Sequence, residues 1–148
     1  LPLFKGASSG IGEGISYLFA SHGCKLSVIG RNKDRIEKVA TTCVNNGLLK
    51  ENVICMAGDL TDGETRNTLI QNTLKAFGRI DVLASTYINN AGVGGMGVCA
   101  DTSESDYRHI IETNQSVPFF LTQLAIPHLK ESKGMLQNLN KSVFKLPK

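Results

Sequence analysis

The sequence lacks the features that mark membrane, secreted and nucleic-acid-binding proteins. Among its 148 residues no apolar run approaches the ~18 residues of a membrane span. The nearest stretch, residues 117–129, is interrupted by Thr122, Gln123 and His128. No basic segment followed by an apolar one opens the chain as a secretory signal would. The 16 basic and 13 acidic residues are interleaved, with no basic block for a nucleic acid. We therefore expect a cytoplasmic protein without a membrane span or a nucleic-acid partner.

Motifs for metal, redox and hydrolytic chemistry are also missing. The four cysteines form no CxxC pair and have no histidine cluster beside them. We expect small buried thiols in a reducing compartment and no metal site, with metal or redox use as the alternative. Neither G-x-S-x-G nor H-E-x-x-H occurs, which removes the usual signatures of a hydrolase. The cysteines are Cys24, Cys43, Cys55 and Cys99.

Apolar periodicity predicts strands that alternate with helices, which is typical of an α/β protein. Right-handed crossovers then give a Rossmann-like doubly wound parallel sheet in the order 3-2-1-4-5. We expect one domain over residues 1–137 and a loosely ordered tail over 138–148. Thr61-Asp62-Gly63-Glu64 resembles a capping box for the third helix. The expected strands are 1–4, 25–30, 53–57, 80–88 and 135–139, and the expected helices lie near 11–22, 36–44, 64–77, 103–111 and 115–131.

The most informative motif is a glycine turn between the first strand and the first helix. It reads Lys5-Gly6-Ala7-Ser8-Ser9-Gly10-Ile11-Gly12. Glycine permits a tight turn and a close backbone approach, and the N–H groups that open a helix attract a pyrophosphate. The spacing G-x-x-x-G-x-G is weak by itself, because such turns also occur without a nucleotide. No Gly-Lys-Ser/Thr follows, so the turn is not a P-loop.

Three further features stand where a dinucleotide would need them, at the ends of later strands. Gly30 and Arg31 follow the second strand, where an acidic residue would favour NAD. The guanidinium of Arg31 suits a 2′-phosphate instead, and a solvated loop charge is the alternative. Asp59 ends the third strand and can accept a hydrogen bond from an adenine amino group. Asn89-Asn90-Ala91-Gly92 is small and polar, so that backbone can pass close to a ribose.

Together these motifs resemble the classical short-chain dehydrogenase/reductase family over residues 3–136. Residues 6–12 are similar to its cofactor loop, Asp59-Leu60 to its adenine-binding pair and residues 89–92 to its NNAG motif. Residues 110–114 resemble the segment that carries its catalytic asparagine, here Asn114. The cofactor-binding residues that the resemblance implies are Gly6, Ser8, Ser9, Gly10, Ile11, Gly12, Arg31, Asn32, Asp59, Leu60, Asn90, Ala91 and Gly92.

The resemblance implies hydride transfer between NADP(H) and a carbonyl or secondary alcohol, with NADP(H) preferred over NAD(H) because of Arg31. In the family a tyrosine is the general acid or base, and a lysine lowers the pKa of its phenol. A serine orients the substrate, the asparagine supports a water, and the cofactor carries the hydride chemistry.

The chain departs from the family in its catalytic half. None of Tyr17, Tyr87 and Tyr107 is followed four residues later by lysine, and the position of the family serine falls near Lys141. We therefore expect a sheet that is incomplete relative to the family's seven strands and a chain that is inactive alone. A small carbonyl or alcohol substrate is expected only if the site is completed. Residues 84–88 insert extra residues before NNAG and can displace Asn90 from the cofactor.

Other interpretations remain open beside the enzyme. The chain can be a non-catalytic nucleotide-binding or interaction module, or a polypeptide that does not fold stably alone. Phe119, Phe120 and their apolar neighbours favour core packing, with a homo-oligomer contact through residues 115–131 as the second interpretation.

Overall fold

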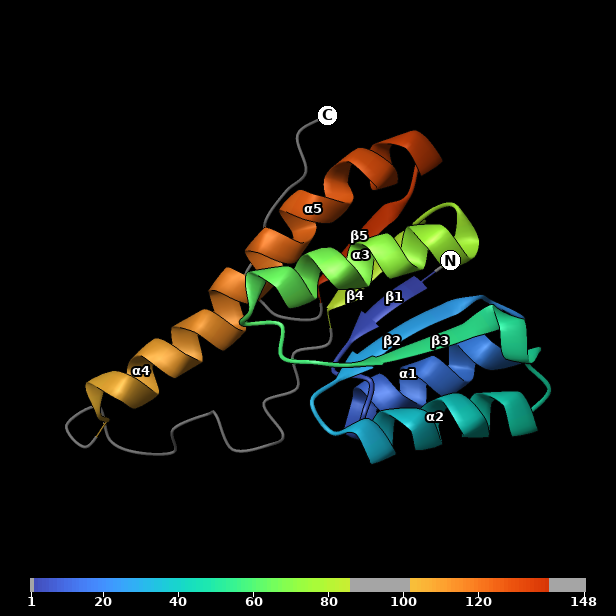
Figure 1. The fold of residues 1–148 in the computed structure, drawn as a ribbon, viewed down its shortest axis with the longest axis horizontal. Coiled ribbons are helices and arrows are strands. Elements are labelled where there is room, and N and C mark those ends of the chain that lie inside the picture. The colour runs from blue at the N-terminus through green and yellow to red at the C-terminus, as the bar shows by residue number, and fades with distance from the viewer. Residues whose placement is uncertain (1, 86–101, 139–148) are drawn as a thin grey trace.

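Parallel strands alternate with helices along the chain, as the apolar periodicity predicts. The computed structural model describes residues 2–85 and 102–138, and Figure 1 shows their arrangement. The strands form a five-stranded parallel sheet in the order β3-β2-β1-β4-β5, which confirms the predicted order. The elements are β1 (Pro2–Lys5), α1 (Gly10–Ser21), β2 (Leu26–Gly30), α2 (Lys33–Asn45), β3 (Val53–Ala57), α3 (Gly63–Phe77), β4 (Val82–Ser85), α4 (Glu104–Ile111), α5 (Val117–Ser132) and β5 (Met135–Asn138).

The helices cover both faces of the sheet. α1 and α2 lie on one face, and α3 and α5 lie side by side on the other (Figure 1). Strand β2 is buried along Leu26–Ile29 because it has β3 and β1 as neighbours and helices on both faces. Such a strand is buried on both faces, which fits its largely apolar sequence; its polar residue, Ser27, has a buried hydrogen-bond partner in Thr73.

Two hydrophobic cores result from the alternation of side chains along the strands. Leu26 and Val28 point toward α1 and α2, whereas Ile29 points toward α3 and α5. Full burial of each such side chain stabilises the fold by roughly 1.5–3 kcal/mol. The first core contains Ala7, Ala20, Leu26, Val28, Ile36, Val39, Cys43 and Leu48, and the second contains Ile29, Leu60, Leu69, Ile70, Ile80, Leu83, Val117, Leu121, Ala125 and Leu129.

The beginning of α3 corrects one sequence expectation. The N-cap is Asp62 rather than Thr61, and its carboxylate accepts hydrogen bonds from the backbone N–H groups of Glu64 and Thr65. The prediction of a capping box that begins at Thr61 is therefore wrong by one residue. An aspartate can cap a helix without the reciprocal side-chain hydrogen bond of a capping box. The helix ends as expected at Gly78, which adopts a left-handed φ of 77°.

The two helices expected near the end of the chain are continuous. A π-helical segment, Glu112–Ser116, joins α4 directly to α5. Pro118 lies in the first turn of α5, and the helix continues through Pro127 to Ser132. A π segment widens one helical turn and changes the direction of side chains, and such segments occur often at functional sites. Asn114 lies within it.

The cysteines differ from expectation at one position. Cys43 is buried and Cys24 is half-buried, but Cys55 is exposed. The expectation of a buried thiol is wrong for Cys55 because β3 forms an edge of the described sheet. Cys99 lies outside the described residues.

The last described strand extends slightly beyond the expected end of the domain. β5 reaches Asn138, one residue past the expected domain boundary, and the tail 139–148 lies outside the described residues.

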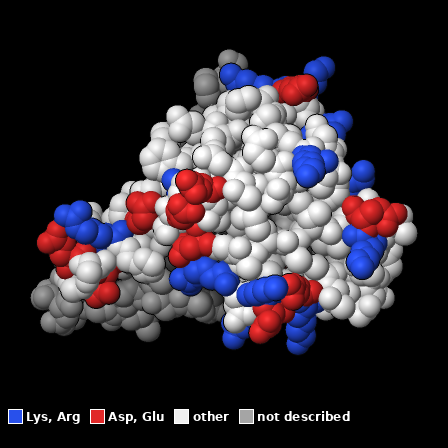
Figure 2. All heavy atoms as spheres, in the orientation of Figure 1, with Lys and Arg blue, Asp and Glu red and all other residues white. Residues whose placement is uncertain are grey.

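None of the described helices has the length and apolarity needed to cross a bilayer. On the face seen in Figure 2, the surface over α3 and α5 is largely uncharged and charged side chains lie mainly around it.

Candidate functional site

The carboxyl ends of β1, β2 and β3 bring three predicted features to one edge of the sheet. Lys5 pairs with Ile29 at the end of β1, and Gly30 pairs with Ala57 at the end of β3. The glycine turn and Arg31 directly follow the ends of β1 and β2, and Asp59 comes two residues after the end of β3. In open parallel sheets this edge is where ligands bind.

The glycine turn places the first turn of α1 at this edge. Gly6 and Gly10 adopt positive φ angles of 75° and 60°, which L side chains rarely adopt. α1 begins at Gly10, and the N-cap residue Ser9 makes no side-chain capping hydrogen bond. The N-cap side chains of α2 and α4 each accept one backbone hydrogen bond, and that of α3 accepts two. The first N–H groups of α1 therefore lack the side-chain cap that those three helices have, and an anion can serve them.

Gly30 allows the glycine turn to lie directly against β2. A Cβ added at Gly30 would come within 2.9 Å of Ser8 Cβ and 3.0 Å of Ser8 Oγ. Any other residue would therefore displace the turn or the strand. The residues present fit a dinucleotide, since the turn, the uncapped start of α1 and the exposed Arg31 all follow strand ends at this edge of the sheet.

Asp59 is held in its anionic form by the residues that follow it. The backbone N–H and the hydroxyl of Thr61 both donate to Asp59 Oδ1, each over 3.0 Å. The backbone hydrogen bond of Thr61 is the main reason that the pKa of Asp59 lies below its ordinary value; partial burial opposes this, and the Thr61 hydroxyl, Arg31 and His109 add to the lowering. Both hydrogen bonds end on Oδ1, which leaves Oδ2 to accept a ligand amino group.

Several predicted residues have a structural role at the site. The Leu60 side chain is buried in the core, so its expected contact with a cofactor falls to its backbone. Asn32 caps α2, and its Oδ1 accepts a hydrogen bond from Arg35 N over 2.9 Å. Gly12 is buried and its carbonyl accepts from Ser16 Oγ, while Ile11 is exposed beside the turn.

The remaining predicted residues are Asn114 and the segment Asn90-Ala91-Gly92. Asn114 is half-buried in the π-helical segment. Asn90, Ala91 and Gly92 lie outside the described residues. Within residues 2–85 and 102–138, no three His, Cys, Asp or Glu side chains come together as metal ligands.

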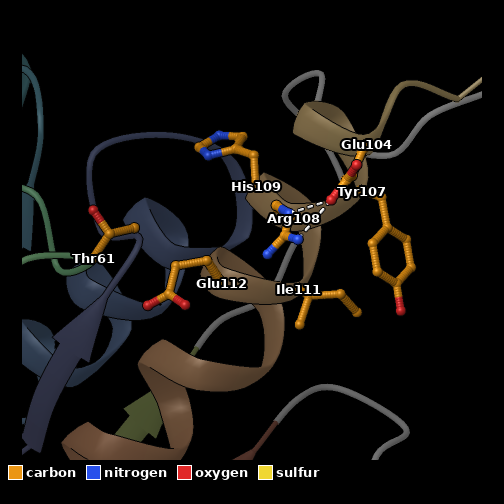
Figure 3. A pocket seen from close by; sticks show the side chains of 7 residues that line it. All are labelled: Thr61, Glu104, Tyr107, Arg108, His109, Ile111 and Glu112. Atoms are coloured by element: carbon orange, nitrogen blue, oxygen red, sulfur yellow. Dashed lines mark hydrogen bonds and ion pairs between the residues drawn. The ribbon is translucent and has the colours of Figure 1, made fainter.

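A hollow of about 670 Å³ lies between the turn after Asp59 and α4. Figure 3 shows Thr61, His109 and Glu112 on the same side of α4, with Tyr107 pointing away from them. Arg108 and Glu104 form an exposed ion pair one helical turn apart along α4. Thr61 therefore takes part both in lining this hollow and in the hydrogen bonds to Asp59.

Sequence reasoning missed one residue of this edge. Arg66 Nη1 donates to the carbonyl oxygens of Leu60 and Thr61, over 2.6 and 2.9 Å. The sequence carries one signal for this role, the positive charge of Arg66. A cation near the start of a helix is unfavourable to the helix dipole unless it has another partner.

Comparisons with known proteins agree with this geometry. The family model described as short chain dehydrogenase matches residues 3–140. Dehydrogenase/reductase SDR family member 7 of Homo sapiens is 38% identical over 137 residues, 91% of this chain and 39% of the relative. 11-beta-hydroxysteroid dehydrogenase-like 2 of Arabidopsis thaliana is 38% identical over 146 residues, 98% of this chain and 46% of the relative.

Solved structures give the same result. The glucose dehydrogenase of Caenorhabditis elegans in its apo form is 30% identical, with a TM-score of 0.80 over 93% of this chain and 52% of its own. The alcohol dehydrogenase of the archaeon Thermococcus sibiricus, complexed with 5-hydroxy-NADP, is 28% identical, with a TM-score of 0.82 over 93% and 56%. The chain therefore spans about half the length of these two solved proteins and less than half the length of the curated relatives described above. It belongs to the short-chain dehydrogenase family of NAD(P)-binding oxidoreductases.

Proposed function

We propose that this chain binds NADP(H), in preference to NAD(H), at the carboxyl edge of β1, β2 and β3. The observation that carries the proposal is the contact of Gly30 with Ser8, next to the exposed Arg31. An acidic side chain at position 30 would select NAD, and the contact leaves no room for one. When bound, the cofactor supplies hydride transfer between its nicotinamide and a carbonyl or secondary alcohol.

The pyrophosphate and the adenosine half of the cofactor each have residues to hold them. The N–H groups that open α1, with the Ser9 hydroxyl, would bind the pyrophosphate. Asp59 would accept a hydrogen bond from the adenine amino group, and Arg31 would bind the 2′-phosphate through its guanidinium. The Thr61 bonds and Arg31 keep the carboxylate charged, which supports its role as an acceptor.

The preference for NADP(H) is tested at Arg31. We expect Arg31→Glu to weaken NADPH binding at least about tenfold and to leave NADH affinity within about threefold, because only NADPH carries the 2′-phosphate. Titration followed by cofactor fluorescence measures both affinities. Lys38→Glu, an equal charge change on an exposed residue of α2, is the matched control. An unchanged ratio of the two affinities in Arg31→Glu would overturn the preference.

We also propose that the 148-residue polypeptide alone does not turn over carbonyl substrates. Asn114 is its single match to the family's catalytic residues, and no tyrosine in the chain is followed four residues later by lysine. In the family it is the lysine that brings the phenol pKa down from its ordinary value of about 10 toward the range useful at neutral pH. NADPH oxidation with a panel of small ketones and aldehydes tests this, and turnover above the rate without protein contradicts it.

The second candidate function is an interaction module that assembles through α5. Phe119 and Phe120 are 49% and 41% exposed, and their rings meet edge to face with centroids 5.3 Å apart. We expect Phe119→Ser to shift an oligomer toward monomer in size-exclusion chromatography with light scattering. Leu18→Ser, at an apolar residue of α1 that is 57% exposed, is the control. A folded chain that shows no saturable NADPH binding would favour this function over the first.

A further inference from the structure

A side chain from α3 holds the backbone of the turn that follows Asp59. The guanidinium of Arg66 donates through Nη1 to Leu60 O and Thr61 O. Two consecutive carbonyl groups are thereby fixed by one charged donor. Hydrogen bonds to charged groups are stronger than those between neutral groups. The turn therefore has less freedom than a surface loop of its length.

The same guanidinium is seated on α5. Its central carbon lies 5.3 Å from the centroid of the Phe120 ring, a distance at which a cation is attracted to an aromatic face. Arg66 is half-buried, and α3 and α5 pack against one another. Phe120 therefore limits where the guanidinium can lie, and the planar group meets the turn in a fixed orientation.

These contacts form a continuous connection from α5 to the carboxylate. Phe120 seats Arg66, Arg66 holds the Thr61 carbonyl, and Thr61 donates its N–H and hydroxyl to Asp59 Oδ1. Displacement of Thr61 would rotate or release the carboxylate, because both of its hydrogen bonds come from that residue. The direction of Oδ2 thus depends on Arg66, although Arg66 makes no described contact with Asp59.

We propose that Arg66, seated by Phe120, is a positioning residue that aims Asp59 at the amino group of the cofactor's adenine. The inference rests on the proposed NADP(H) binding and adds a residue to it. Arg66 touches neither the cofactor nor the reacting atoms in this assignment. Its effect is on adenine recognition, not on binding in general.

The test compares NADPH with reduced nicotinamide hypoxanthine dinucleotide phosphate, which carries a ring carbonyl in place of the adenine amino group. We expect the wild-type chain to bind NADPH about tenfold more tightly, because one hydrogen bond to a charged acceptor is worth that much. We expect Arg66→Met, which keeps the length and loses the donors, to lower the ratio to below about threefold. Equal weakening of both ligands would indicate a merely structural role and overturn the proposal.

A second pair of variants tests the seat of the guanidinium without removing it. Phe120→Tyr keeps an aromatic face and should retain the wild-type ratio, whereas Phe120→Leu should lower it. Phe120 is partly exposed, so both variants are expected to fold, and a cooperative thermal transition checks this. A wild-type ratio in Phe120→Leu, or in a folded Arg66→Met, overturns the inference while NADPH binding stands. Failure of the wild-type chain to bind NADPH overturns the proposed function and this inference together.

Discussion

The hydroxyl of Ser27 on β2 and the hydroxyl of Thr73 on α3 form a buried hydrogen bond, with 2.8 Å between the oxygens. Thr73 donates its own proton to Leu69 O over 2.7 Å, so Ser27 is the donor to Thr73. Both residues are buried between the sheet and α3. This orientation makes the two partners unequal, because Thr73 keeps a hydrogen bond without Ser27 and Ser27 keeps none in the described structure without Thr73.

The inequality predicts different costs for the two substitutions. We expect Thr73→Val to lower the free energy of unfolding by about 1–3 kcal/mol, because it leaves the Ser27 hydroxyl buried without a partner. Ser27→Ala alone should lower the free energy of unfolding by less. Adding Ser27→Ala to Thr73→Val should recover part of the stability that Thr73→Val loses. Urea unfolding measures all three, with Thr68→Val at an exposed position of α3 as the control. A larger cost for Ser27→Ala would contradict the assigned direction of the bond.

The contact of Gly30 with Ser8 predicts a second effect, on both binding and stability. We expect Gly30→Ala to cost about 1–3 kcal/mol of stability, because the new methyl would force the glycine turn away from β2. The same displacement should weaken NADPH binding about tenfold or more, since the turn carries the start of α1. Calorimetry and cofactor fluorescence measure the two effects.

Gly14→Ala is the matched control for that experiment. A Cβ at Gly14 meets nothing within 4 Å, and the residue lies inside α1 at an ordinary helical position. Alanine should therefore stabilise the helix by roughly 0.5–1 kcal/mol and leave binding unchanged. Equal behaviour of Gly30→Ala and Gly14→Ala would mean that the turn tolerates a side chain at position 30.

The titration of Asp59 gives a third prediction. Its pKa lies below the ordinary value chiefly because Thr61 N–H donates to the carboxylate. A lowered pKa in the folded chain stabilises the fold above the ordinary aspartate pKa near 4, and this stabilisation is lost as the pH falls through the lowered folded value. We expect an NMR titration of the Asp59 carboxyl carbon to give a midpoint below that of an aspartate in an unfolded peptide.

Substitution of Thr61 separates the two hydrogen bonds. Thr61→Ala removes the hydroxyl and keeps the dominant backbone N–H, so the midpoint of Asp59 should rise only part of the way to its ordinary value. Thr61→Ser keeps both donors and should leave the midpoint where it is. A full return to the ordinary value in Thr61→Ala would show that the hydroxyl, and not the backbone, holds the charge.

The sequence predicts the fold well because the fold depends on repeated patterns. The largely apolar segment Leu26–Gly30 indicates a central parallel strand, and glycines such as Gly78 mark helix ends. The crossover rule then leaves few strand orders, of which the predicted one is confirmed. The three strand ends of the candidate site follow from the same order.

Other features depend on contacts that no local pattern records. The π-helical segment Glu112–Ser116 changes helical register without a glycine or a cap to mark it. Cys55 has apolar neighbours in sequence, yet it is exposed because β3 lies at an edge of the described sheet. Arg66 gains its importance from Phe120, which is 54 positions later in the numbering and adjacent only through the packing of α3 on α5.

The junction between α5 and β5 gives the last prediction. A Cβ added at Gly134 would collide with the backbone carbonyl of Asp81, which also accepts a hydrogen bond from Met135 N over 2.6 Å. Because backbone cannot move aside as a side chain can, we expect Gly134→Ala to cost about 3 kcal/mol, at the upper end of overpacking effects. Gly78→Ala meets open space and bears only the strain of its positive φ, about 1 kcal/mol. Chemical unfolding of the two variants side by side measures the difference, and an equal or larger loss in Gly78→Ala would mean that β5 shifts freely against β4.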